Sequence, residues 1–154
     1  MTRERDNAIA EMIAAARAAR AHAYAPYSRF AVGAALRLTD GTIVSGSNME
    51  NASYGLSLCA EAVAIASANS AGRLADIEAI AIVGGAIENG ANAADNPVTP
   101  CGRCRQMLAE AEAVSGREII VTCASVEGEA MAQYSVEQLL PYSFGRRTLI
   151  TGER

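Results

Sequence analysis

Two cysteines three residues apart are the first feature of this chain that suggests chemistry. Cys101 and Cys104 lie in the run Pro-Cys-Gly-Arg-Cys-Arg-Gln, at the predicted start of a helix. Residues three apart share one face of a helix, so both thiols can reach a single metal ion. Taken alone, a C-x-x-C pair is equally compatible with a redox motif or with half of a structural zinc site.

A third cysteine lies far earlier, in the run Cys59-Ala60-Glu61, and only the fold can bring it to the same place. Three thiolates would leave the fourth position of a Zn²⁺ ion open, as in a catalytic zinc site. Glu61 cannot easily be a ligand if Cys59 is one, so its carboxylate is available to carry protons. These four side chains are enough to build a hydrolytic zinc site, although Glu61 on its own reads as an ordinary solvated helix residue.

The remaining thiol and the single histidine have simpler explanations. Cys123 follows an apolar run and is expected to be a buried, inert thiol rather than a fourth ligand. His22 falls in the last turn of the first predicted helix, where a favourable interaction with the helix dipole is a sufficient reason for it.

The pattern of apolar residues predicts the helices and strands that must position these side chains. Helices are expected over residues 3–23, 58–71, 101–114 and 136–140, and strands over residues 30–38, 42–47, 77–83, 118–124 and 129–134. Residues 39–41 should form a hairpin turn, and residues 84–99 a long loop that leads into the second cysteine cluster. With no repeat and no linker, residues 1–154 are expected to form one domain, a three-layer α/β/α sandwich around a mixed five-stranded sheet.

Composition limits the partners and the location. Thirteen basic and seventeen acidic side chains give a net charge of -4, which argues against a nucleic acid because phosphate binding needs a basic surface. No apolar run is long enough to span a membrane, and the first six residues alternate in charge rather than begin a signal peptide. We therefore expect a cytoplasmic chain with no membrane segment, in which the four cysteines stay reduced.

With these motifs in place, the chain resembles the small cytidine deaminase family. The resemblance also rests on the runs Tyr-Ser-Arg-Phe-Ala-Val-Gly-Ala-Ala-Leu at 27–36, Gly-Ser-Asn-Met-Glu-Asn-Ala-Ser-Tyr-Gly at 46–55 and Leu-Leu-Pro-Tyr-Ser-Phe-Gly at 139–145. These motifs occur in the family's order, and the likeness extends from about residue 15 to residue 149. It implies zinc as the cofactor, with Cys59, Cys101 and Cys104 as ligands and Glu61 as the catalytic proton shuttle.

The same resemblance implies the residues that bind the substrate. Phe30 would pack on the pyrimidine, Asn48 and Glu50 would hold the ribose hydroxyls, and Ala60 would be a further substrate-binding residue. An amide followed two residues later by a carboxylate at a strand end is also a plausible clamp for a diol on chemical grounds. Taken singly, Phe30 reads equally well as a core aromatic, and Asn48 and Glu50 as turn residues.

Tyr54 and Phe144 are expected, from the resemblance, to reach into the sites of neighbouring subunits in a homotetramer. The small residues on the predicted helix at 58–71 would suit tight helix packing across such an interface. A monomer of 16.0 kDa with both aromatics in its own core is the alternative.

One departure from the family pattern concerns charge. Members usually carry Arg directly after the motif Glu, whereas this chain has Ala62. Three thiolates around Zn²⁺ leave a net negative charge, so a cation should compensate, with Arg103 as the candidate and Arg105 as its competitor. Ala62 combined with Arg103 also resembles the blasticidin S deaminases, which act on a cytosine nucleoside antibiotic.

The resemblance therefore implies zinc-dependent hydrolytic deamination of cytidine and deoxycytidine to uridine and deoxyuridine, a reaction of pyrimidine salvage. Retention of Phe30, Asn48, Glu50 and the region around Phe144 favours these nucleosides. Blasticidin S deamination and a non-catalytic, zinc-stabilised module remain as alternatives.

Overall fold

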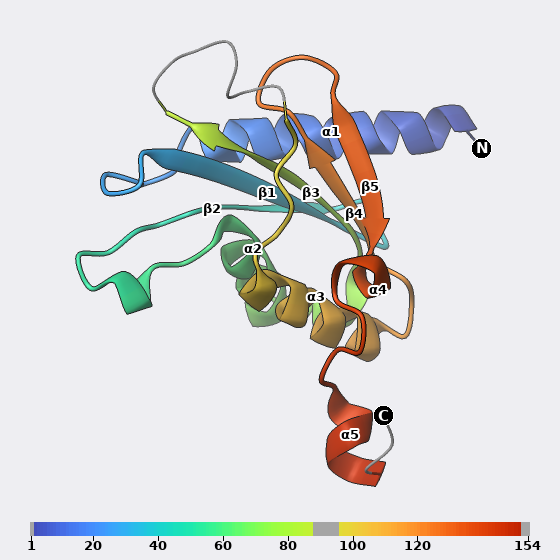
Figure 1. Ribbon diagram of the computed structural model, residues 1–154. Coiled ribbons are helices and arrows are strands. Elements are labelled where there is room, and N and C mark those ends of the chain that lie inside the picture. Colours follow the sequence, from blue (N-terminus) through green and yellow to red (C-terminus); the bar gives the residue numbers. More distant parts are fainter. Residues whose placement is uncertain (1, 88–95, 152–154) are drawn as a thin grey trace.

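A five-stranded sheet forms the middle layer of the protein in the computed structural model, which describes residues 2–87 and 96–151 (Figure 1). The strands lie in the order β2-β1-β3-β4-β5. Neighbours β3 and β4 run parallel and the other pairs run antiparallel, so the sheet is mixed. The strands are β1 (Phe30–Leu38), β2 (Ile43–Ser47), β3 (Ile77–Ala86), β4 (Ile120–Ala124) and β5 (Met131–Ser135).

Helices cover both faces of this sheet. The long α1 (Thr2–Arg20) lies on one face, while α2 (Ala60–Ser70) and α3 (Gly102–Ser115) lie side by side on the other (Figure 1). The shorter helical elements are η1 (Tyr54–Leu56), η2 (Leu74–Asp76), α4 (Val136–Leu139) and α5 (Arg146–Thr151). This arrangement confirms the predicted α/β/α fold class. Within the described ranges, no helix has both the length and the apolar character needed to cross a membrane.

Alternation along the strands divides the core into two parts. Leu36 on β1 and Ile80 on β3 face α2 and α3, together with Leu108 of α3. The intervening residues face α1, where Met12 and Ala16 pack against small side chains of β1 and β3. A strand whose two faces are both buried reads as a near-continuous apolar run, which explains why residues 77–83 were recognisable from sequence.

Two glycines let helices approach the sheet unusually closely. A Cβ atom on Gly33 of β1 would lie 1.9 Å from the carbonyl oxygen of Ala16 in α1. On the other face, a Cβ atom on Gly46 of β2 would lie 2.5 Å from the carbonyl oxygen of Ala60 in α2. The position of each helix relative to the sheet therefore depends on a missing side chain.

The predicted loop at 84–99 begins too early. Strand β3 continues to Ala86, because Gly84, Gly85 and Ala86 pair with residues 30–32 of β1. Pairing with an already formed neighbour outweighs the low strand propensity of glycine. The predicted loop residues 88–95 lie outside the described part of the chain, and helix α5 was not predicted at all.

Gly33→Ala is expected to lower the free energy of unfolding by about 3 kcal/mol or more, because the added methyl meets backbone atoms that cannot rotate away. Urea unfolding followed by circular dichroism measures the change. Gly55→Ala is the matched control, since nothing lies within 4 Å of its added Cβ atom. Equal stability of the two variants would contradict the close helix contact.

Candidate active site

Three thiols meet where α2 and α3 begin. The Sγ atoms of Cys59, Cys101 and Cys104 all lie within 4.8 Å of one another, and those of Cys59 and Cys101 are 3.7 Å apart. Tetrahedral coordination with Zn–S bonds of about 2.3 Å places sulfur atoms about 3.8 Å apart. The geometry and the soft donor set both fit a zinc ion, so the structure brings together the three residues that the sequence singled out.

The two helix starts explain how thiols from distant segments come together. Cys59 and Cys101 directly precede α2 and α3 and have extended backbone conformations, with ψ angles of 151° and 166°. Their carbonyl oxygens accept the first hydrogen bonds of the helices, from Val63 and Arg105. The two side chains make no capping hydrogen bond, so their sulfur atoms are available to a metal at the positive helix ends.

The thiols do not share negative charge equally. Hydrogen bonds from the Cys104 and Cys101 thiols, together with the nearby charge of Arg103, lower the pKa of Cys59 to about 6. The pKa of Cys104 is raised, because its proton is held in the hydrogen bond to Cys59 and because the side chain is buried. Cys59 is therefore the first of the pair to become a thiolate, the form that binds metal.

The two candidate arginines have different roles. Arg103 contributes its positive charge to Cys59 and lies with one guanidinium nitrogen 3.5 Å from the carbonyl oxygen of Ser57. Arg105 instead donates hydrogen bonds to the carbonyl oxygens of Pro100 and Leu139, at 2.7 and 2.8 Å. Arg105 thus anchors the segment before Cys101, and Arg103 is the arginine that offsets thiolate charge.

Glu61 lies beside the thiols in the first turn of α2. Its side chain is buried, with 4% of the residue exposed, and this burial raises the pKa of the carboxyl, with a further increase from the charge of Cys59. A buried carboxyl with a raised pKa next to a potential metal site has the properties of a group that accepts and returns a proton.

A cavity of about 320 Å³ opens next to Glu61 and the thiols. Among the predicted site residues it is lined by Phe30, Asn48, Glu50, Cys59, Ala60, Glu61 and Cys101. Sequence reasoning missed the apolar wall residues Val32, Leu58, Ile82 and Val98, as well as Ser57 and Thr99. The alternation of β1 was a usable signal for Val32, which lies two residues after Phe30 on the same face. None of the described residues that line this cavity is basic.

Asn48 and Glu50 hold the entry to β1 in place. The amide oxygen of Asn48 accepts a hydrogen bond from the backbone N–H of Val32 at 2.8 Å, and its amide nitrogen donates to the carbonyl oxygen of Phe30 at 2.9 Å. The Glu50 carboxylate accepts hydrogen bonds from the N–H groups of Tyr27 and Ser28 and from the Ser28 hydroxyl, and the hydroxyl is the main cause of its lowered pKa. Both side chains therefore line the cavity and also fix the backbone on either side of Phe30.

Tyr54 and Phe144 are not brought to the cavity within one chain. Tyr54 is 74% exposed, and its ring packs edge to face on Tyr27 with centroids 5.6 Å apart. Phe144 is 58% exposed, and its carbonyl oxygen accepts a hydrogen bond from the Gln106 side chain. Neither residue lines the cavity of its own chain.

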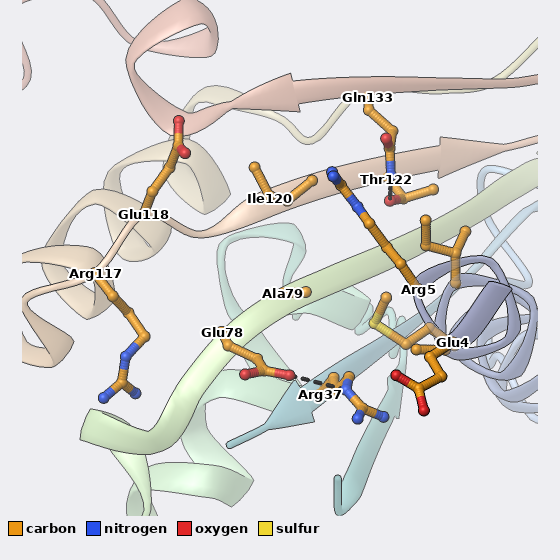
Figure 2. Close-up of a pocket in the computed structure, with 13 residues that line it drawn as sticks. Glu4, Arg5, Arg37, Glu78, Ala79, Arg117, Glu118, Ile120, Thr122 and Gln133 are labelled. Carbon is orange, nitrogen blue, oxygen red and sulfur yellow. Dashed lines mark hydrogen bonds and ion pairs between the residues drawn. The ribbon is translucent and has the colours of Figure 1, made fainter. Parts of the chain in front are cut away.

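A second cavity and the fourth cysteine, Cys123, lie apart from the thiol cluster and Glu61. A larger cavity of about 520 Å³ lies between α1 and the sheet, where Figure 2 shows Arg5 near Gln133 and the ion pair of Arg37 and Glu78, but no thiol lines it. Cys123 is fully buried, and burial raises its pKa to about 11, as expected for an inert thiol.

Comparison with known proteins gives consistent matches. The family model described as the cytidine and deoxycytidylate deaminase zinc-binding region matches residues 6–123, which include all three clustered cysteines. A cytidine deaminase from Halalkalibacterium halodurans is 44% identical over 82% of this chain and 86% of that protein. A crystal structure of cytidine deaminase from Burkholderia pseudomallei is also 44% identical, with a TM-score of 0.73 over 87% of this chain and 97% of that one. A blasticidin-S deaminase from Bacillus cereus is 35% identical over 51% of this chain and 56% of that protein.

The thiol cluster predicts about one zinc ion per chain. Each of the single variants Cys59→Ser, Cys101→Ser and Cys104→Ser should lose most of the zinc, because a hydroxyl is a poor replacement for a thiolate ligand. Metal analysis by mass spectrometry measures the content, and Cys123→Ser, outside the cluster, should keep it. Undiminished zinc in Cys104→Ser would overturn the assignment.

Arg103→Ala should raise the pKa of Cys59 from its value of about 6, because loss of the positive charge makes the thiolate harder to form. In the metal-free protein, alkylation of Cys59 followed by peptide mass spectrometry across pH would show the curve moving to higher pH. Arg103→Lys retains the charge and should leave the curve near its original position. If the alanine variant behaves like the lysine variant, the hydrogen bonds from the Cys104 and Cys101 thiols lower the pKa of Cys59 without help from Arg103.

Proposed function

Because the chain belongs to the cytidine and deoxycytidylate deaminase zinc-binding family, we propose that it deaminates cytidine and deoxycytidine to uridine and deoxyuridine in pyrimidine salvage. The observation that carries this proposal is the meeting of three thiols and the buried Glu61 at one cavity. We propose a single domain over residues 1–154 and a cytoplasmic location. A reaction of this kind consumes one water and releases one ammonia for each nucleoside.

The chain's own residues divide the work between binding and proton transfer. Cys59, Cys101 and Cys104 would hold zinc, which supplies a Lewis acid that lowers the pKa of a coordinated water to about 7. Glu61 takes a proton from the attacking water and passes it to the ring nitrogen. The same carboxyl then takes the second proton of that water, from the hydroxyl now attached to the ring carbon, and delivers it to the amine that leaves as ammonia, a double role that its raised pKa supports.

The cavity suits a nucleoside rather than a nucleotide. Its volume of about 320 Å³ is near the lower limit for small-molecule sites. Two carboxylates and no basic side chain occur among its described lining residues, so a phosphate would be repelled. Phe30 offers an aromatic surface for the pyrimidine, the backbone of Ala60 lies at the cavity wall, and the second acceptor sites of Asn48 and Glu50 remain for ribose hydroxyls.

Blasticidin S is the second candidate substrate. The combination of Ala62 and Arg103 favours it, as does the partial likeness to a blasticidin-S deaminase. That likeness covers about half of the chain, whereas the cytidine deaminase matches cover more than four fifths, so we favour cytidine and deoxycytidine.

Ultraviolet absorbance tests the proposal, since conversion of the cytosine ring to uracil changes its spectrum. The zinc-loaded protein should change the spectrum of cytidine faster than that of blasticidin S. Activity on blasticidin S alone would select the second candidate. Flat spectra with both would leave a non-catalytic zinc module.

Glu61→Gln should lower turnover of cytidine by about 10²–10⁴-fold, because the amide keeps the shape but cannot accept a proton. In metal-free protein, the same variant should be more heat-stable than wild type at pH 8. Because its pKa is raised on folding, Glu61 binds more protons in the folded state than in the unfolded chain. The free energy of unfolding therefore falls as the pH rises from the pKa of the unfolded chain to that of the folded state. The difference in melting temperature should narrow as the pH falls. Near-normal turnover would show that another group moves the proton.

We propose that the active form is a homotetramer with shared sites. Exposed apolar side chains are concentrated in residues 24–56 and 142–150, including Tyr54, Leu56, Phe144 and Leu149. Helix α5 extends away from the three layers, as Figure 1 shows. Surfaces of this kind are typical of interfaces between subunits.

Light scattering should give four times the chain mass of 16.0 kDa. Phe144→Ala should raise KM for cytidine, because an aromatic contact from the neighbouring subunit is lost. Met131→Ala is the control, since Met131 is similarly exposed on β5 and lies at the opposite edge of the sheet from β2. A fully active monomer would exclude shared sites.

A further inference from the structure

Gly84 lies on β3 close to three side chains that line the cavity of the candidate site. It is buried and pairs with Val32 of β1. A Cβ atom at this position would lie 2.6 Å from Cγ2 of Val98, 3.2 Å from Cγ2 of Val32 and 3.3 Å from Cε1 of Phe30. All three of these side chains line the cavity next to Glu61.

Backbone conformation does not explain this glycine. The glycines with positive φ angles in the described chain are Gly41, Gly72, Gly116 and Gly128, and Gly84 is not among them. Its backbone is that of an ordinary strand residue, so alanine is conformationally allowed here. Alanine is disfavoured by lack of space, because Val98 occupies the volume that a Cβ atom at position 84 would need.

Val98 thus sits directly on the backbone of β3. This contact sets the distance between the 96–100 segment and the Phe30 side of the cavity. A side chain at position 84 would force Val98 to shift and would crowd Phe30, and both of these residues line the cavity.

We propose that Gly84 is a specificity-determining residue: by seating Val98 against β3, it sets the largest pyrimidine that the cavity accepts. This inference rests on the proposed function, because the ligand concerned is the cytosine nucleoside. The substrates that this residue would distinguish are cytosine nucleosides whose ring carries a small substituent in addition to the amine.

The neighbouring glycine provides a matched control. A Cβ atom on Gly85 would also meet a close neighbour, at 2.7 Å from Cγ2 of Val126, although its next contact lies at 3.8 Å, and it would point to the α1 face of the sheet. Gly84→Ala and Gly85→Ala therefore add the same methyl to adjacent residues of one strand. They differ in whether that methyl disturbs the site cavity.

The readout is the ratio of kcat/KM for cytidine to that for 5-methylcytidine, measured on zinc-loaded protein with the metal content recorded. One methyl group in a tight apolar pocket changes such discrimination by about 10-fold or more. Gly84→Ala should raise the ratio by about 10-fold, mainly through KM, whereas Gly85→Ala should leave it unchanged. Val98→Ala alone should lower the ratio, and adding it to Gly84→Ala should return the ratio toward the wild-type value.

The outcomes separate the two claims. Wild-type protein with no activity on cytidine would remove the proposed function itself. An active wild type in which Gly84→Ala leaves the ratio unchanged, or in which Gly85→Ala shifts it equally, would overturn the role of Gly84 alone. If Gly84→Ala loses zinc or does not fold, Val98→Ala provides the test. An unchanged ratio of kcat/KM values in that variant would overturn the role proposed for Gly84.

Discussion

The crowding of three thiols and one carboxyl into a single corner is the constraint on which the rest of the structure depends. Cys59, Cys101, Cys104 and Glu61 are held close together, and each would be negative when ionised. Repulsion between like charges disfavours such a cluster unless positive charge is supplied. Two helix N-termini and Arg103 supply part of it, and a zinc ion held by the three thiols would supply the rest. Hydrogen bonds between the thiols lower the pKa of Cys59 and raise that of Cys104, while burial, with a smaller contribution from the charge of Cys59, raises the pKa of Glu61.

Small residues make that corner possible. The first turn of α2 lies directly on Gly46, and a side chain there would displace the backbone of Ala60, between the ligand Cys59 and Glu61. On the opposite face, α1 crosses β1 at Gly33, which keeps β1 and its Phe30 at a fixed depth. Gly84 has a similar effect beside the cavity, where its missing side chain lets Val98 pack on the backbone of β3. The high alanine content of the chain is thus related to function, because thin layers bring side chains from separate elements to one point.

Local patterns in the sequence predicted much of this and could not predict the rest. Residues three apart at a helix start must share a face, so the pairing of Cys101 with Cys104 followed from spacing alone. Apolar periodicity located the principal helices and all the strands. Contacts between distant segments left no such trace. The sequence could not distinguish the backbone hydrogen bonds of Arg105 from the electrostatic effect of Arg103 on Cys59, nor show that Val98 would fill the space above Gly84. The extension of β3 to Ala86 likewise depends on pairing with β1.

X-ray absorption at the zinc edge tests the central claim most directly, because it counts the ligands of the metal in the protein as purified. Three protein thiolates with an open fourth position predict three sulfur neighbours at about 2.3 Å and one lighter oxygen or nitrogen neighbour. Four sulfur neighbours would mean that the position needed for water is closed. That result would contradict a hydrolytic site and support a purely structural one.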